Sequence, residues 1–493
     1  MALLLLSVLA ASAEQGLADQ GLTAPRPSAG SDAAVPSSEC VITDAPFSAI
    51  ADNTTVNTEA IQRAIDACHA AHPGGARVVV PAGAFKTGAI LLRSNMELHL
   101  TKGAGLYGST NPRDYPLLKR ALPFGDTMWQ ALVSGYNLTN VSVTGENAQV
   151  PGSDSIIDGV GWWWNCLYYT SHGMPWQSCI PNRAAAPYCK AFNPKNLTVE
   201  AVTAASGGPA GKAALRPKLI EFFNCTGVKM ADFTAQNAMC WTIHPVYSSD
   251  VVIQRLTVLG AREIGGVSGI EHDSCVNCLV EDTHVDIGDD GITVKANNFS
   301  HWGVTGLTNS RNVTVRRCTV LSRNICLGAS TSGGISGAVF EDLVLGDRTT
   351  PTLPWAIKFK ISSGFIEDVA FRRISIGQVG NTPWMYPDAR WSALMIDFDD
   401  TRPTNSTAPH LWARGVVFED ISVVSEKAPS HISGPDTCLA RLTLRNVTLN
   451  GSKQWLGCHN IDLSSLTVDS VSPPLMCTGC GEHPVTLGPT AVV

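Results

Sequence analysis

The sequence predicts an all-β chain whose short strands wind into a single-stranded parallel β-helix. A repeated unit carries this prediction: two apolar-x-apolar pairs flank a short polar bend. Only one stretch, near the start, has helical periodicity, so helices and strands do not alternate as they do around a parallel α/β sheet. The repeated units occupy residues 251–258, 278–287, 313–320, 338–345, 369–376, 416–423 and 442–449.

The repeated units are expected to stack on one another, because a unit with one apolar face cannot bury that face alone. Stacking along one axis gives a parallel β-helix. A β-sandwich or a β-propeller is the rival architecture, but the strands lack the hairpin dipeptides that those folds use, such as Asn-Gly at two-residue spacing. The pair Asn450-Gly451 follows a repeated unit and does not lie inside a hairpin.

The chain begins with an apolar block, residues 1–13, that ends in Ala-Ser-Ala. Small residues at these positions are typical of a cleavage site, so we predict a signal peptide, although no Lys or Arg precedes the block. Residues 14–39 are rich in Ala, Gly, Pro and Ser, which predicts a flexible lead-in. The β-helix domain is expected at 40–476, and residues 477–493 are expected to form a C-terminal tail.

A short amphipathic helix is predicted over residues 57–71, ending before a Pro-Gly-Gly stretch at 73–75. Strands follow at 77–80, 86–92 and 96–100, each bounded by turn residues. The apolar residues at helical spacing are Ala60, Ile61, Ala64, Ile65 and Cys68.

Composition excludes two classes of partner. Charged residues make up 16% of the 493-residue chain and the net charge is −7, without a basic stripe that could neutralise phosphates. We therefore expect no nucleic-acid partner. No apolar run reaches the roughly 18 residues that a transmembrane helix needs, so we expect no membrane partner either.

Cysteines and sequons favour secretion, to the extracellular space or a cell wall. Fifteen cysteines are many for a cytosolic enzyme of this size. Asn-x-Ser/Thr sequons are frequent. Asn312 and Asn446, however, lie at polar bends, where Asn and Thr side chains can hydrogen-bond to the local backbone. We therefore expect about half of the sequons to have a structural role only, without glycosylation. The sequons are at Asn53, Asn137, Asn140, Asn196, Asn224, Asn298, Asn312, Asn405, Asn446 and Asn450.

The spacing of some cysteines allows two interpretations. Cys275 with Cys278, and Cys477 with Cys480, have the C-x-x-C spacing of a zinc half-site. In a secreted chain disulfide bonds are the favoured alternative, and the odd number of cysteines leaves at least one thiol without a partner in the chain. We expect disulfide bonds and no metal site.

Long insertions interrupt the repeats at 162–212, 349–355 and 378–391, and all three contain tryptophans. In solenoids, insertions tend to collect on one face, often the binding face. These aromatic side chains are expected either to anchor the loops by packing or, where they are exposed, to stack on sugar rings.

The stretch 286–295, Asp-Ile-Gly-Asp-Asp-Gly-Ile-Thr-Val-Lys, is the strongest candidate for chemistry. Asp289 and Asp290 lie between two glycines at a turn that enters a strand. On its own, Asp-Asp-Gly is typical of a turn or a calcium loop. Paired carboxylates at a cleft are also what glycoside hydrolysis requires, one as a protonated acid and one as an ionised base.

The string Gly-Asp-Asp-Gly-Ile-Thr-Val-Lys at 288–295 resembles the Gly-Asp-Asp-Cys-Ile-x-x-Lys motif of glycoside hydrolase family 28, the polygalacturonases. The resemblance runs from about residue 40 to about residue 468. It implies a right-handed, pectin-lyase-like parallel β-helix with an N-terminal capping helix, which makes 40–476 a catalytic domain. Further stretches similar to the family are 58–67, 80–83, 88–95, 156–159, 216–220 and 241–247.

By this resemblance, Asp289 is the general acid and Asp290 belongs to the pair that activates water. The family's other catalytic aspartate belongs to an Asn-Thr-Asp-Gly-Ile-Asp motif, which here reads Gly-Val-Ser-Gly-Ile-Glu at 266–271. Ser268 therefore replaces the aspartate. Glu271 is the one carboxylate kept nearby, and we predict that it takes the aspartate's place.

The predicted substrate-binding residues are all cationic. The family's Gly-His-Gly aligns near Ser322-Arg323-Asn324, so the histidine is missing. Its Arg-Ile-Lys, which grips a uronate carboxylate, aligns with Lys358-Phe359-Lys360; lysines at i and i+2 of a strand share one face but lack the planar fork of arginine. We predict that Lys358, Lys360, Arg323 and Lys295 bind substrate.

The sequence thus predicts a secreted, monomeric, inverting glycoside hydrolase that acts on a pectin-like, uronate-containing polysaccharide without metal or organic cofactor. The alternative is a relative that binds wall polysaccharide but has lost turnover, because Ser268 and the missing histidine weaken the catalytic constellation. A calcium-dependent lyase is disfavoured, since no arginine base stands beside an acidic cluster.

Overall fold

The structure is a computed structural model. It describes residues 38–146, 155–165, 216–296, 309–380, 392–398 and 411–480, apart from gaps of one to three residues, together with strands β36 and β37. The predicted signal peptide, most of the lead-in, and much of the loops at 162–212 and 378–391 lie outside the described residues.

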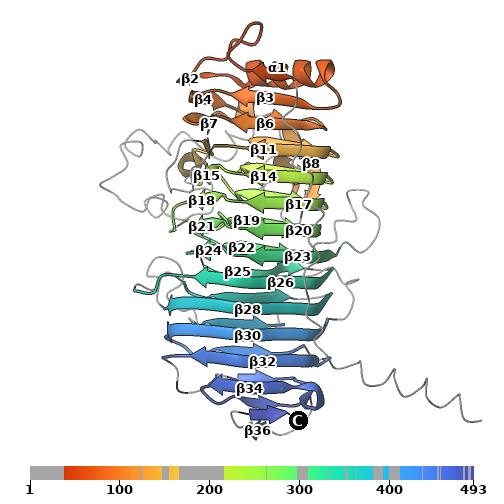
Figure 1. The fold of residues 1–493 in the computed structure, drawn as a ribbon, viewed down its shortest axis with the longest axis vertical. Coiled ribbons are helices and arrows are strands. Elements are labelled where there is room, and N and C mark those ends of the chain that lie inside the picture. The colour runs from red at the N-terminus through yellow and green to blue at the C-terminus, as the bar shows by residue number, and fades with distance from the viewer. Residues whose placement is uncertain are drawn as a thin grey trace, which may run out of the picture.

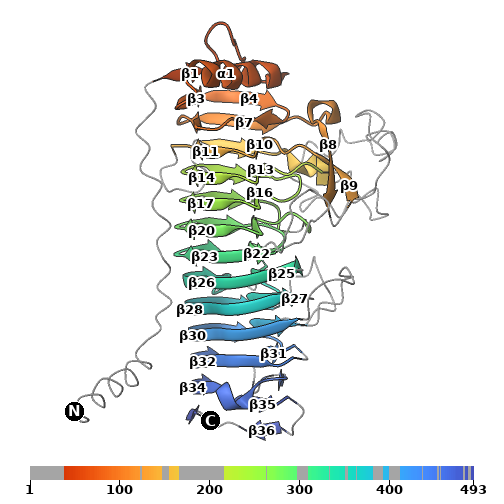
Figure 2. The same ribbon diagram turned by 90° about the vertical axis from the view of Figure 1, so that its right-hand side faces the viewer.

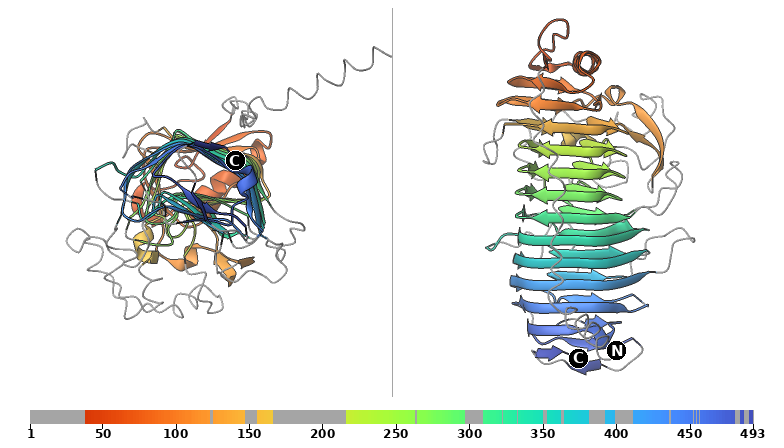
Figure 3. Two further views of the ribbon diagram at one scale, coloured as in Figure 1. Left: turned by 90° about the horizontal axis from the view of Figure 1, so that it is seen from below. Right: turned by 45° about the vertical axis from the view of Figure 1, so that its right-hand side comes forward.

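Strands stack rung upon rung along one long axis, as Figure 1 shows, and the chain is a parallel β-helix as predicted. Most strands belong to a 22-stranded sheet, which we call sheet A, and eleven others form a second sheet, sheet B. Viewed along the axis, the successive rungs superpose in one coil (Figure 3).

Sheet A contains two runs of strands per rung, which merge into single long strands from β26 onward. The first run is β1 (Glu39–Val41), β3 (Ala76–Val80), β6 (Met96–Leu100), β11 (Thr139–Thr144), β14 (Thr226–Ala231), β17 (Ser249–Gln254), β20 (Val276–Glu281) and β23 (Ser310–Arg316). The second is β2 (Asp52–Val56), β4 (Gly83–Thr87), β7 (Ala104–Gly108), β12 (Ile156–Asp158), β15 (Thr234–Gln236), β18 (Thr257–Leu259), β21 (His284–Asp286) and β24 (Thr319–Val320). The merged strands are β26 (Gly334–Leu345), β28 (Phe365–Val379), β30 (Trp412–Glu426) and β32 (Leu439–Leu449), and β34 (Thr467–Ser472) follows them.

Sheet B supplies one strand per rung, and the first residues of six successive strands form a ladder of inward-facing isoleucines in register: Ile220, Ile243, Ile270, Ile292, Ile325 and Ile357. Because side chains alternate along a strand, the residue that follows each isoleucine points outward. The strands are β5 (Ile90–Leu91), β10 (Val133–Tyr136), β13 (Ile220–Phe223), β16 (Ile243–Val246), β19 (Ile270–Asp273), β22 (Ile292–Lys295), β25 (Ile325–Thr331), β27 (Ile357–Ile361), β29 (Leu394–Asp397), β31 (His431–Ser433) and β33 (Gly457–His459).

The polar bends of the repeats place residues in the left-handed backbone region. At the bend within sheet A, Arg255, Asp282, Arg317 and Asp342 have φ of 52°, 52°, 51° and 55°. A left-handed residue turns the strand sharply without breaking the stack, and Asn and Asp tolerate this conformation well.

The sequons at Asn312 and Asn446 lie at such bends, with φ of 54° and 52°. Their carboxamides bond the neighbouring rungs, at 2.9 Å to Asn277 and 2.7 Å to Asp420. Their local structural role is as expected from the sequence.

The N-terminal end of the stack is covered by α1 (Thr58–Ala71), the predicted helix (Figure 1). Its apolar stripe of Ile61, Ala64, Ile65 and Cys68 is buried, and a disulfide joins Cys68 to Cys40 of β1. Burying four such side chains is what keeps a helix of this length ordered.

The expected C-terminal tail instead closes the other end. Within residues 477–493, β36 (Pro484–Thr486) pairs with β35 (Met476–Thr478), and β37 (Thr490–Val492) adds antiparallel to β34. Disulfides join Cys438 to Cys480 and Cys458 to Cys477, so this C-x-x-C motif holds disulfides and not zinc.

One antiparallel hairpin, β8 (Leu117–Leu122) with β9 (Gly125–Trp129), projects outside the coil on the side of sheet B (Figure 2). There are two single turns of 3-10 helix, Pro112–Asp114 and Leu463–Ser465, and residues 161–165 form one further short helix. No helix among the described residues is long and apolar enough to cross a membrane.

Candidate active site

Asp289 and Asp290 lie on the loop between β21 and β22, where the chain passes from sheet A to sheet B. Gly288 is required by close packing: a Cβ there would come within 2.2 Å of the Ile264 carbonyl oxygen. The backbone N–H of Gly269 donates to the Asp290 carbonyl at 2.9 Å, which fixes the loop against the preceding rung. The two carboxylates are therefore held just before β22, where the chain enters sheet B.

Three N–H donors converge on the Asp289 carboxylate. Arg323 Nη1 lies 2.8 Å from Oδ1, and the Asp290 backbone N–H donates to the same oxygen at 2.9 Å. The Gly266 backbone N–H donates to Oδ2. Arg323, which we had expected to bind substrate, thus pairs with the predicted acid.

Asp290 is paired with Lys360. The Lys360 ammonium lies 2.8 Å from Oδ2 and 3.0 Å from Oδ1. Burial alone would raise the pKa of Asp290, but the Lys360 and Arg323 charges outweigh it and hold this pKa well below its usual range. Burial opposes the charge of Lys360, yet Asp290 raises the pKa of Lys360 above its ordinary value. Asp290 is therefore an ionised carboxylate, as a base must be.

Lys358 lies two residues before Lys360 on the same face of β27. Its ammonium sits 3.8 Å above the ring of Trp355. Burial, together with the like charge of Lys360, lowers the pKa of Lys358 to about 8. The site therefore gathers two carboxylates and three cations, from loops and strands of three successive rungs.

Relatives of the chain are found both in sequence and in structure, although a scan against models of known protein families finds no match. An exo-poly-alpha-D-galacturonosidase of Dickeya chrysanthemi is 31% identical over 452 residues, covering 84% of this chain and 72% of that protein. The chain belongs to the polygalacturonase family, glycoside hydrolase family 28. A probable polygalacturonase of Vitis vinifera is 25% identical over 455 residues, covering 89% of this chain and 79% of the relative.

Solved polygalacturonase structures share the fold. A hyperthermoactive exopolygalacturonase from Thermotoga maritima superposes with a TM-score of 0.64 at 21% identity, covering 93% of this chain and 95% of that one. A family 28 exopolygalacturonase of Yersinia enterocolitica gives 0.62 at 22% identity, covering 86% and 73%. At these identities the likeness shows the shared fold alone.

Ser268, which the motif resemblance sets at the position of the family's second catalytic aspartate, is buried next to the Asp289 loop. The Ser268 carbonyl accepts hydrogen bonds from Thr242, at 2.9 Å from its N–H and 2.8 Å from its hydroxyl. The neighbouring Gly269 packs against Gly291, since a Cβ at Gly269 would lie 2.4 Å from the Gly291 carbonyl oxygen. Ser268 and Asp290 therefore occupy equivalent positions in two adjacent rungs.

Glu271 lies three residues further along β19, and its carboxylate pairs with Lys295 at 2.7 Å. Three residues of strand span about 10 Å, so Glu271 lies about that far along the chain from Ser268. The Lys295 ammonium also lies 3.7 Å from the ring centre of Trp241. The predicted replacement base and one predicted substrate-binding cation are therefore engaged with each other.

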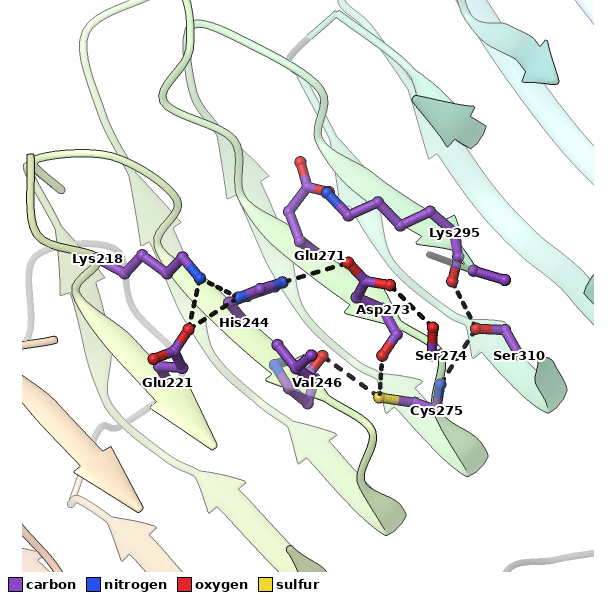
Figure 4. A network of polar contacts seen from close by, with 12 residues as sticks. Lys218, Glu221, His244, Val246, Glu271, Asp273, Ser274, Cys275, Lys295 and Ser310 are labelled. Atoms are coloured by element: carbon purple, nitrogen blue, oxygen red, sulfur yellow. Dashed lines mark hydrogen bonds and ion pairs between the residues drawn. The ribbon is translucent and has the colours of Figure 1, made fainter. Parts of the chain in front are cut away.

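A buried polar network of residues on β13, β16 and β19 and of Lys218, just before β13, adjoins this pair and was not singled out from the sequence (Figure 4). Lys218 contacts Glu221 and lies 2.7 Å from His244 Nδ1, and His244 Nε2 lies 3.9 Å from Asp273. All four side chains are almost fully buried. Lys218 and His244 lie in stretches that resemble the family. Strand alternation also places Glu221 and His244 on the outward face. These two features of the sequence could have indicated the network.

Chemically, the arrangement holds ionised carboxylates beside a surplus of positive charge on one face of the β-helix. Such a site suits an anionic sugar, with a carboxylate positioned to take a proton from water. Among the described residues, no cluster of His, Cys, Asp or Glu could hold a metal ion. The C-x-x-C pair Cys275 and Cys278 is buried, and neither cysteine is in a disulfide.

Proposed function

We propose that the chain is a secreted, inverting hydrolase of a pectin-like, uronate-containing polysaccharide. The observation that carries the proposal is the grouping of Asp289 and Asp290 with Arg323, Lys358 and Lys360. Three cations against two carboxylates leave positive charge for a uronate, and the motif around the aspartates matches the family to which the chain belongs. The names of the relatives, polygalacturonases and exo-acting galacturonosidases, support the same substrate class.

The experiment is release of reducing ends from a panel of polysaccharides: polygalacturonate, methyl-esterified pectin, xylogalacturonan, and a neutral galactan as the uncharged control. Asp289→Asn serves as the inactive control for the wild type. Release from polygalacturonate, with α-configured substrate yielding β-configured product in the proton NMR spectrum, supports an inverting hydrolase. Absence of release from every member overturns the proposal. The product sizes, monomers or a ladder of oligomers, separate exo from endo cleavage.

A second candidate is a polysaccharide-binding protein without turnover. Two observations favour it: Ser268 stands where the family has a catalytic aspartate, and Arg323 is paired with the predicted acid. Affinity electrophoresis in gels containing polygalacturonate distinguishes the two. Retardation with unchanged polymer length supports the binder, and migration identical to that in a plain gel removes it.

A further inference from the structure

A fourth cation, Arg216, reaches the loop that holds Asp289. Arg216 lies just before β13, and its guanidinium lies against Gly266, in the loop before β19 and two rungs later. A Cβ built on Gly266 would lie 2.8 Å from Arg216 Nη2 and 3.7 Å from Cζ. The Gly266 backbone N–H in turn donates to Oδ2 of Asp289. The guanidinium therefore packs against the residue that binds the predicted acid.

Buried groups fix the position of the Arg216 side chain. Its Nη1 donates to Asn165 Oδ1 at 2.6 Å. Asn165 is buried and its Nδ2 donates to the Ala238 carbonyl at 3.2 Å, so the amide turns its oxygen toward the arginine. Gly161, in the same short helix, packs closely on Ala238, because a Cβ there would lie 2.1 Å from the carbonyl oxygen. The guanidinium is thus held in place from behind.

The glycine at 266 makes room for this guanidinium. By the motif resemblance, Gly266 stands where the family has an asparagine. Its φ is 70°, a conformation that asparagine also tolerates, so the backbone alone does not require glycine. A side chain at this position would collide with Arg216 Nη2. The missing side chain at 266 and the position of Arg216 therefore belong together.

Cations approach the two aspartates from both directions along the axis of the β-helix. Lys358 and Lys360 come from β27, on the side of the later rungs, and Lys360 pairs with Asp290 at 2.8 Å. Arg216 comes from the side of the earlier rungs and ends beside the loop before β19. Strands β19 and β27 are three rungs apart, about 14 Å, which leaves room for more than one sugar ring.

We propose that Arg216 binds the carboxylate of the uronate on the N-terminal side of Asp289, while Lys358 and Lys360 bind the uronate on the other side. This inference rests on the uronate-polymer substrate of the proposed function and deepens it. The planar donors of a guanidinium match the two oxygens of a carboxylate. The site then recognises two neighbouring acidic sugars, and a methyl ester at the first of them removes the charge that Arg216 binds.

The test measures the binding of thio-linked trigalacturonate, whose sulfur linkages resist hydrolysis, by isothermal titration calorimetry. We expect Arg216→Gln to raise Kd by about 10- to 100-fold, the range for a lost hydrogen bond to a charged group. Arg216→Lys keeps the charge without the planar fork, and its Kd should fall between the two. Arg441→Gln, at an exposed arginine of β32, is the control and should leave Kd unchanged.

The fully methyl-esterified analogue separates recognition of charge from support of the fold. Its Kd should be the same for the wild type and Arg216→Gln, because an ester offers no carboxylate to the guanidinium. An equal loss of affinity for acid and ester, or no loss for the acid, would overturn the inference. Where the ester binds too weakly to measure, the double-variant comparison with Gly266 decides.

Gly266→Ala tests the geometry without changing the arginine. The added Cβ must push Nη2 aside, so we expect Kd to rise about 10-fold in the wild type, with no further rise in the Arg216→Gln background. Gly227→Ala is the control for backbone strain, because Gly227 has a φ of 71° and a Cβ there would have no heavy atom closer than 3.5 Å. Equal losses in both backgrounds would show that the effect does not pass through Arg216.

Reducing-end release from polygalacturonate by the same proteins separates this inference from the proposed function. Binding that depends on Arg216 without any release overturns the hydrolase and keeps the inference. Release with binding that is independent of Arg216, or with no binding of the thio-linked sugar, overturns the inference alone. Circular dichroism confirms folding, and Arg216→Lys tests the same point should the glutamine variant not fold.

Discussion

Arg323 and Asp289 form a buried ion pair, with Nη1 2.8 Å from Oδ1 and side chains that are 6% and 16% exposed. By the motif resemblance, Arg323 stands near the position of the family's histidine, and a guanidinium, unlike an imidazole, does not release a proton. Together with the backbone N–H groups of Gly266 and Asp290, this pair fixes the position of the Asp289 carboxylate.

Removing the arginine should therefore destabilise the fold. We expect Arg323→Met to lower the free energy of unfolding by about 3 kcal/mol, because it leaves Asp289 buried without its cation. Urea denaturation measures the loss. The matched control is Arg317→Met, which breaks an exposed pair with Asp282 and should cost about 1 kcal/mol or less. Equal losses for the two variants would contradict a special role for the buried pair.

A carboxylate introduced at position 268 should raise activity. Ser268 lies on the rung next to Asp290, and by the motif resemblance it stands where the family has its second catalytic aspartate. In Ser268→Asp we expect kcat on polygalacturonate to rise about 10-fold, because a second carboxylate assists water activation, a step worth about 100-fold or more when a base is well placed. Ser268→Asn, which has the same size without the charge, is the control. A rise in both variants, or in neither, would show that the water is activated without this position.

His272 should make the fold sensitive to acid. The side chain points into the coil beside Val294, is fully buried, and its ring nitrogens have no hydrogen-bond partner among the described residues. Burial lowers the pKa of His272 to about 4. Between pH 6.5 and 4 the unfolded chain binds this proton and the folded chain does not, so stability falls as the pH drops, by about 1.4 kcal/mol per pH unit.

His272→Leu removes that dependence and also the cost of an unpaired buried ring, so we expect it to stabilise the protein by about 1 to 3 kcal/mol at pH 5. Urea denaturation at pH 7 and pH 5 measures both effects. His459→Leu, at an exposed histidine, is the control. If the two pH values give the same difference between His272→Leu and wild type, His272 does not titrate as stated.

Charges alternate from rung to rung at the bend of sheet A. Arg316 and Arg317 lie between Glu281 with Asp282 on one side and Glu341 on the other, and Arg317 contacts Glu281 and Asp282 at 2.6 and 2.8 Å. Arg317→Glu puts like charges side by side. We expect it to lower the free energy of unfolding by about 1 to 2 kcal/mol in low salt and by less than half of that in 1 M NaCl, because salt screens exposed charges.

Arg317→Gln separates the loss of attraction from the added repulsion. It should cost about 0.5 kcal/mol, as exposed pairs usually do. A loss in Arg317→Glu that is independent of salt would mean that packing, and not charge alternation, is responsible.

Local features of this fold could be predicted from the sequence. The helix at 57–71 and the strand at 96–100 are found as α1 and β6 within one residue, because their apolar periodicities are strong and their ends carry Gly, Pro or Asn. The bends at Asn312 and Asn446 are also as predicted, since Asn favours the left-handed conformation that they adopt.

Contacts between rungs could not be predicted in the same way. Asp289 and Arg323 are 34 residues apart, and Asp290 and Lys360 are 70 apart. Loops of different lengths lie between successive rungs, so spacing along the chain does not reveal which residues stack. For this reason Arg323 and Lys295 were expected to face substrate, whereas they pair with Asp289 and Glu271.

The proposed function depends most directly on whether this site cleaves a uronate polymer. The deciding measurement is reducing-end release from polygalacturonate by the wild type and by Asp289→Asn, with neutral galactan in parallel. We predict release by the wild type from polygalacturonate alone, and a loss of at least about 100-fold in the variant, whether Asp289 acts as an acid or holds the site together. Equal release by wild type and variant, or none from any polymer, would contradict the account.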